Sequence, residues 1–209
     1  SICLGNEPYT YAFNTQYYKP FWYEYLKNIY GNDINKLNEV CKTDYKAFED
    51  IEMKGQKEFT VLYKHSMEFN EDVLADYLGY LGACVKASDP DMPVHAKLLP
   101  ITVDYGRSAL TKGENYEKLA PIFDYNGNDA NTAYNHPKQS LLSKMEWYDL
   151  QTSVKDAPVL NTEDHFQMDS VNIDYSPKML KHAMADAWQG VMHNRAQSMV
   201  WVLEREQQY

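Results

Sequence analysis

The chain has 209 residues and is acidic, with 30 Asp and Glu against 20 Lys and Arg and a formal net charge of -10. Nucleic acids and anionic membrane surfaces are bound through basic patches, and no cluster of Lys and Arg occurs, so we expect neither as a partner. The three cysteines form no disulfide framework or zinc motif, and we expect no cofactor and no metal ion. The 18 tyrosines suit contacts with neutral sugars.

The first predicted element is a short apolar strand that ends in a carboxylate, in the segment Leu4-Gly5-Asn6-Glu7-Pro8. In α/β proteins such a run is typical of a buried parallel strand, and ligands bind at the carboxyl ends of these strands. The position of Glu7 therefore makes it a candidate catalytic residue.

Helical patterns follow this strand. Pro20 suits a first helical turn, and Gly31 is expected to end the helix that it begins. A short helix is predicted to start at Asn32 or Asp33. Residues 59–85 form the longest helical pattern, with an apolar stripe that we expect to pack on a sheet.

Two further strands are predicted in the middle of the chain. Residues 93–99 form the first, in which His95 and Lys97 share one face because side chains alternate along a strand. Residues 119–125 form the second, followed by a polar cluster at 124–129. That cluster departs from the calcium-loop pattern, so we interpret it as a strand-to-loop turn with substrate-binding groups, Tyr125 and Asn126 among them; metal binding is the weaker alternative.

The last third of the chain repeats the alternation of helix and strand. A helix is predicted over 136–150, and a strand from Ala157 delivers Glu163 at its end, with His165 two residues later. Ser176 and Pro177 open an amphipathic helix, and residues 198–203 form the final strand. Strands alternating with helices indicate a parallel α/β architecture with right-handed crossovers.

Glu7 and Glu163 together point to cleavage of a glycosidic bond. That reaction uses one protonated carboxyl to give a proton to the leaving oxygen and one ionised carboxylate to attack the sugar. A mechanism with retention requires the two groups about 5 to 5.5 Å apart. Three other carboxylates compete and rank below Glu163: Asp124, Asp164 and Glu204.

The two strand ends resemble those of clan A glycoside hydrolases. Asn6-Glu7-Pro8 is similar to the fourth strand of that clan, and residues 21–48 resemble the segment after it in family 42 β-galactosidases and agarase-like relatives. Asn161-Thr162-Glu163 stands where the clan carries its nucleophile, on the seventh strand, and Ser198-Met199-Val200-Trp201 is placed like the eighth.

The resemblance implies a (β/α)8 TIM barrel of which this chain supplies roughly the C-terminal five strand-helix units, as a single catalytic-barrel portion over 1–209. The first three strands are then expected to be absent. A retaining glycoside hydrolase acting on β-galactosides or related oligo- and polysaccharides is implied. Pro8 departs from the family 42 pattern, as does the sequence around Glu163, so specificity for β-galactosides does not follow.

The resemblance also assigns roles to single residues. Glu7 is the implied acid/base and Glu163 the implied nucleophile. Asn6 would bond the sugar 2-hydroxyl, and Trp201 would form an apolar platform under the ring. His165, His95 and Tyr125 are candidates for orienting the nucleophile by their positions.

One alternative is a non-catalytic fragment that binds sugar or serves in assembly. An incomplete barrel sheet exposes strand edges, which invites a partner segment or a second copy of the chain to complete it. A nucleotide-binding domain is disfavoured because no Gly-rich phosphate loop follows any predicted strand. No signal peptide or membrane span is visible, and the location in the cell stays open.

Overall fold

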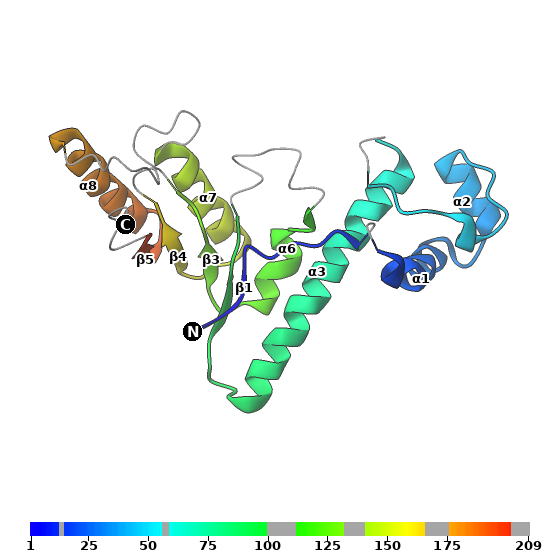
Figure 1. The fold of residues 1–209 in the computed structure, drawn as a ribbon, viewed down its shortest axis with the longest axis horizontal. Coiled ribbons are helices and arrows are strands. Elements are labelled where there is room, and N and C mark those ends of the chain that lie inside the picture. The colour runs from blue at the N-terminus through cyan, green and yellow to red at the C-terminus, as the bar shows by residue number, and fades with distance from the viewer. Residues whose placement is uncertain (13–14, 56–58, 100–111, 132–140, 166–175, 202–209) are drawn as a thin grey trace, which may run out of the picture. The chain divides into compact units, whose positions relative to one another are not determined.

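The computed structural model describes residues 1–12, 15–55, 59–99, 112–131, 141–165 and 176–201 (Figure 1). The chain divides into two compact units. Unit 1 comprises Ser1–Pro8, Leu78–Ser108 and Tyr116–Tyr209, and unit 2 comprises Tyr9–Tyr77 and Ala109–Asn115. Both catalytic candidates, Glu7 and Glu163, belong to unit 1. No helix among the described residues has the length and apolar character needed to cross a membrane.

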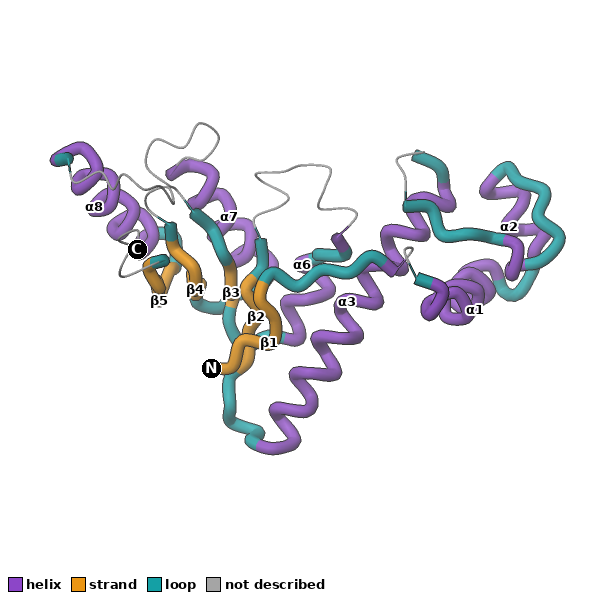
Figure 2. Tube along the Cα trace, in the orientation of Figure 1, coloured by secondary structure: helices purple, strands orange, loops and turns teal. Residues whose placement is uncertain are grey.

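Unit 1 contains parallel strands arranged in the order of the chain, as Figure 2 shows. The first pair and the last three strands are joined by a parallel bridge between Leu98 and Asn128. Two hydrogen bonds support that bridge, from the Leu98 N–H to the Gly127 carbonyl at 3.3 Å and from the Asp129 N–H to the Leu98 carbonyl at 2.9 Å. The strands are β1 Ile2–Asn6, β2 Val94–Lys97, β3 Asn126–Asn128, β4 Val159–Asp164 and β5 Arg195–Val200.

The contact between β2 and β3 depends on a glycine. A Cβ atom at position 127 would lie 2.2 Å from the Ala96 carbonyl oxygen and 2.7 Å from Cδ2 of His95. Gly127 therefore allows the two backbones to approach closely, which a side chain would prevent. Asp129, two residues further on, is held at the end of the strand pair by this contact.

Helices connect the strands of unit 1. The helix α3, Val61–Ser88, enters the unit at Leu78, α7 is Leu141–Val154 and α8 is Pro177–Met192. Shorter turns are α6 at Tyr116–Leu119 and the 3-10 helix η5 at Ala120–Ile122. The Ser176 hydroxyl caps α8 by accepting the N–H of Met179, as the sequence predicts. In Figure 1, α7 lies along β3 and β4, and α8 lies beside β5. The predicted parallel alternation is confirmed.

One predicted strand is wrong, and another begins earlier than predicted. Residues 119–125 contain the last residue of α6, then η5 and a bend, in place of a strand, because Pro121 lacks the N–H that a strand ladder needs and lies in the first turn of the 3-10 helix. The last strand starts at Arg195, three residues before the predicted start at Ser198, because the charged Arg195 is buried by ion pairs. The predicted positions 136–140 and 202–204 lie outside the described residues.

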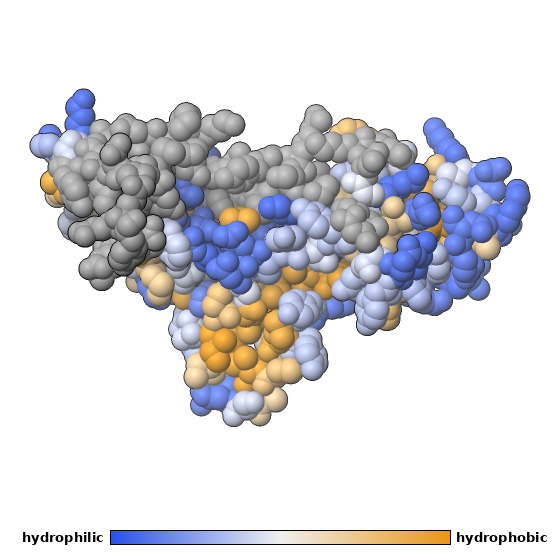
Figure 3. All heavy atoms as spheres, viewed as in Figure 1, coloured by the Kyte–Doolittle hydropathy of each residue, from blue (hydrophilic) through white to orange (hydrophobic). Residues whose placement is uncertain are grey.

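One face of α8 is apolar and exposed. Trp188 is 70% exposed, and the apolar residues one helical turn away from it are exposed as well. Figure 3 shows a second apolar area, over β1 and the C-terminal half of α3, two elements to which the exposed Ile2 and Cys84 belong. The exposed apolar residues of α8 are Leu180, Met184, Trp188, Val191 and Met192.

Unit 2 is a small helical body with its own core. It contains α1 Lys19–Tyr30, α2 Ile34–Cys41, the first part of α3, and the 3-10 helices η2 Gln16–Tyr18 and η3 Phe48–Asp50. Gly31 ends α1 at a φ of 65°, and Asp33 caps α2, both as predicted. The core centres on Trp22, whose indole N–H donates to the Ile51 carbonyl at 3.0 Å.

Candidate active site

Glu7 is turned out of its strand by an unusual backbone conformation. It follows the last residue of β1 and has a φ of 46°, in the left-handed region that residues other than glycine rarely adopt. Its N–H donates to the Lys97 carbonyl at 2.9 Å, which fixes the strand end against β2. The register of this strand pair shifts between Cys3 and Asn6, so the chain bends just before the glutamate.

Lys97 brings three carboxylates together. Its side chain is buried, and its Nζ atom lies 3.8 Å from Oε1 of Glu7 and 3.8 Å from Oδ2 of Asp129. The same atom donates a hydrogen bond to Oε2 of Glu163 and forms an ion pair with it. Carboxylates from the ends of β1, β3 and β4 therefore meet at one ammonium group. We call Glu7, Lys97, Asp129 and Glu163 the carboxylate cluster.

Glu163 is held in its ionised form. Burial by itself would raise the pKa of this carboxyl, but hydrogen bonds from Lys97 and His165 outweigh burial and hold its pKa below the ordinary value. His165 lies with Nε2 3.2 Å from Oε1 of Glu163. The backbone N–H of Glu163 also donates to Oδ1 of Asn161 at 3.3 Å. An ionised carboxylate in a fixed orientation is what a nucleophile requires.

Asp129 has the opposite character. Burial, a hydrogen bond with the Glu7 carboxyl and the negative charge of Glu163 together raise the pKa of Asp129 to about 8, although Lys97 acts against them. Asp129 therefore carries a proton at neutral pH, beside two carboxylates of the same site. The site contains one ionised acid and one protonated acid, as acid/base chemistry at a single carbon atom needs.

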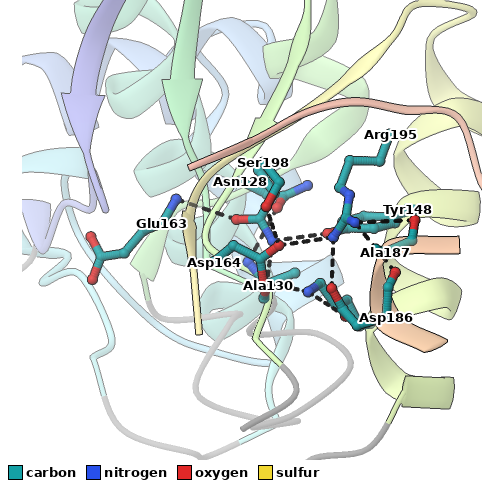
Figure 4. A network of polar contacts seen from close by, with 11 residues as sticks. Asn128, Ala130, Tyr148, Glu163, Asp164, Asp186, Ala187, Arg195 and Ser198 are labelled. Atoms are coloured by element: carbon teal, nitrogen blue, oxygen red, sulfur yellow. Dashed lines mark hydrogen bonds and ion pairs between the residues drawn. The ribbon is translucent and has the colours of Figure 1, made fainter. Parts of the chain in front are cut away.

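A second set of charges lies on the helix side of β4, shown in Figure 4. Lys144 of α7 donates to Asp164 at 2.5 Å and to Asp186 of α8 at 2.7 Å. Arg195 of β5 donates to Asp164 at 2.8 Å and to Asp186 at 2.9 Å. We call these four residues the buried ion cluster. In Figure 4 Asp164 points into this cluster and the Glu163 carboxylate points away from it.

The buried ion cluster removes one competitor from the site. Asp164 is 2% exposed and fully engaged by two cations and by the Ser198 hydroxyl, which donates to it at 2.6 Å. The ranking of Glu163 above Asp164 therefore agrees with the geometry. Asp124 lies at the other end of the sheet, where it accepts the Val94 N–H at 2.7 Å, and Glu204 lies outside the described residues.

The structure does not bring Tyr125 and Asn126 to the carboxylate cluster. Asn126 is the first residue of β3 and pairs with Val159, the first residue of β4, so both lie at the amino ends of the strands. The Asn126 side chain donates to the carbonyl groups of Lys155 and Ala157 and so has a structural role there. Tyr125 precedes it in the chain and is half-buried.

The remaining predicted residues lie at or near the cluster. Asn6 precedes Glu7, is exposed, and pairs in register with Lys97. The Trp201 ring lies 6.0 Å from the His165 ring, centroid to centroid. His95 is buried one step below Lys97 on the same face of β2, with both ring nitrogens lacking a hydrogen-bond partner within the described residues. Burial lowers the pKa of His95, so it is neutral.

Asp129 was not singled out by the sequence, in which residues 124–129 form one polar cluster. Of that cluster, Asp129 lies at the carboxyl end of β3. The signal was the two-residue alternation along Gly127 and Asp129, which puts both on one face. Asp129, Glu163 and His165 have donor atoms within 4.8 Å of one another, but the Lys97 ammonium already pairs with two of them, and we assign no metal ion to them.

Comparison with known proteins gives structural matches alone. No protein-family model and no curated protein sequence matches the chain. An exo-carrageenase of glycoside hydrolase family 42 from Bacteroides ovatus matches with a TM-score of 0.72 and 24% identity, over 90% of this chain and 27% of that chain. A β-galactosidase from Bacillus circulans sp. alkalophilus matches with a TM-score of 0.71 and 18% identity, over 96% of this chain and 30% of that chain.

A third matching structure is an enzyme of another kind. The catalytic domain of a β-amylase from Paenibacillus polymyxa matches with a TM-score of 0.62 and 14% identity, over 90% of this chain and 48% of that chain. The chain thus spans less than a third of the exo-carrageenase and of the Bacillus circulans β-galactosidase. It has the fold of part of a (β/α)8 barrel, which confirms the predicted fold class.

Proposed function

We propose that this chain carries the catalytic pair of a retaining glycoside hydrolase acting on β-glycosides, with Glu7 as acid/base and Glu163 as nucleophile. One observation carries the proposal: two glutamates from distant parts of the sequence meet at the Lys97 ammonium, one of them held ionised. Two carboxylates in one site are what retaining hydrolysis uses. The fold, shared with β-galactosidases, agrees with this chemistry.

The proposed reaction has two steps. In the first, an oxygen of Glu163 attacks the anomeric carbon, the glycosidic bond breaks, and Glu7 gives a proton to the leaving oxygen. In the second, Glu7 takes a proton from water, whose oxygen displaces Glu163 from the sugar. Under this proposal Asn6 is a hydrogen-bonding partner of the bound sugar, and Trp201, which is exposed, is an apolar platform under its ring.

The test is hydrolysis of aryl β-glycosides, β-galactosides and carrageenan by the full chain, with Glu7→Gln and Glu163→Gln alongside. We expect hydrolysis of at least one substrate and a loss of about a thousandfold or more in each variant, the effect of removing an essential catalytic group. Glu39→Gln is the matched control, because Glu39 lies exposed on α2. Full activity in either catalytic variant would refute the assignment.

The second candidate is a sugar-binding or assembly fragment of such a barrel. The exposed apolar face of α8 favours it, together with the match to less than a third of the exo-carrageenase and of the β-galactosidase chain. Under this reading a partner segment, or a second copy of the chain, covers the sheet edges. Sugar binding by the parent without hydrolysis of any substrate in the panel would favour this candidate over the catalytic one.

A further inference from the structure

We propose that Asp129 shares one proton with Glu7, so that the acid of this site is a pair of carboxyl groups; this inference rests on the proposed function. Lys97 is then the counter-ion of Glu163 first and of this pair afterwards. Asp129 acts through Glu7 and is therefore a positioning residue for the proton.

The geometry brings the two carboxyls to one cation. Glu7 and Asp129 each lie 3.8 Å from the Lys97 Nζ atom and are within hydrogen-bonding reach of each other. Their exposure differs, since the Asp129 side chain is 7% exposed and that of Glu7 is 38% exposed. Burial disfavours the charged form, so the shared proton rests on Asp129. Glu7 is the member of the pair that a sugar can reach.

The charges around Asp129 favour one bound proton on the Glu7–Asp129 pair at neutral pH. Three ionised carboxylates beside one ammonium would leave two uncompensated negative charges in a half-buried site. The raised pKa of Asp129, to about 8, agrees with a proton held by the pair. The described titratable groups that surround it are Glu7 from β1, Lys97 and the neutral His95 from β2, and Glu163 and His165 from β4.

The charge of the cluster stays constant through the first chemical step. As Glu163 forms its bond to the anomeric carbon it becomes a neutral ester, and the pair loses its proton to the leaving oxygen. One negative charge disappears at Glu163 and one appears on the pair, so Lys97, released from Glu163, pairs with Glu7 and Asp129. In the second step a proton from water returns to the pair as Glu163 is released.

Carboxyl carbon NMR of the full chain, labelled with ¹³C in Asp and Glu, tests this arrangement without needing substrate. In the parent we expect the Asp129 carboxyl to titrate in two steps, the upper one near pH 8, because coupled groups titrate as a pair. In Glu7→Gln we expect Asp129 to show one step at lower pH, since the carboxyl that raises its pKa is gone. The control Asp156→Asn removes an exposed charge and leaves both steps in place.

A single titration step for Asp129 in the parent would overturn the proposal, and this result needs no variant to fold. Activity supplies a second measurement. If the chain hydrolyses glycosides, Asp129→Asn should move the alkaline limb of the kcat/KM profile to lower pH, whereas a structural role would lower kcat/KM at every pH and leave the limb in place. A chain with coupled titration but no hydrolysis would refute the proposed function and leave the shared proton standing.

Discussion

Lys97 helps to set which carboxylate of the site is ionised, together with His165 and with the burial of Asp129. Lys97 donates to Glu163 and lies farther from Glu7 and Asp129, so its charge favours the anion at Glu163 most. A lysine buried in this way is stable because carboxylates surround it. The same residue fixes the end of β1 through its carbonyl oxygen, which accepts the Glu7 N–H.

Replacing Lys97 by Met is expected to shift the pH dependence of activity. The pKa of Glu163 is held down against burial by hydrogen bonds from Lys97 and His165, so loss of Lys97 raises it. Glu163 must be ionised to attack, and the acid limb of the kcat/KM profile should therefore move to higher pH. Lys46→Met, at an exposed position, is the control. An acid limb that stays where it is in the parent would contradict this role.

At the level of residues, the sequence indicated the positions of Glu7, Glu163 and His165 at strand ends, because each follows an apolar run. Asp129 follows Asn126–Asn128, a strand with no large apolar residue, and the usual hydrophobic signal is missing there. This strand is buried through side-chain amides and a glycine contact, which depend on the partner strand.

At the level of elements, the buried ion cluster joins two strands and two helices behind Glu163. The charges of its two cations and two carboxylates cancel. Gly190 of α8 leaves space for the Arg195 guanidinium, since a Cβ at position 190 would lie 2.4 Å from Cζ of Arg195. The cluster fixes Asp164, and with it the backbone of Glu163. The sequence could not show this, because four charged residues far apart in the chain look like surface residues.

Lys144→Met is expected to destabilise the protein strongly. It would leave Asp164 and Asp186 buried with one cation in place of two, and breaking a buried ion pair from one side costs about 3 to 5 kcal/mol. Urea unfolding measures the loss. Lys178→Met on the exposed part of α8 is the matched control and should change the unfolding free energy by less than about 0.5 kcal/mol. Equal stability of the two variants would show that the cluster does not hold β4.

At the level of the whole molecule, the order of the elements was predictable and the outer surfaces were not. Parallel strands alternating with helices are specified by apolar periodicity, and the match to family 42 structures confirms the fold. The sequence predicted an amphipathic helix at α8, but its apolar face is exposed in the described structure. Within the described residues β1 pairs with β2 alone and β5 with β4 alone. Hydrophobic patterning shows which face is apolar and cannot show what covers it.

The account rests on Glu163 as the group that bonds to the sugar, and rapid quenching of the full chain with a substrate it hydrolyses tests this most directly. Mass spectrometry of the digested protein should find a glycosyl group on the peptide containing Glu163, and Glu7→Gln, which slows release of the sugar, should increase its amount relative to the parent. The glycosyl group should be absent in Glu163→Gln. A glycosyl group on another carboxylate, or hydrolysis that inverts the anomeric configuration, would contradict the account.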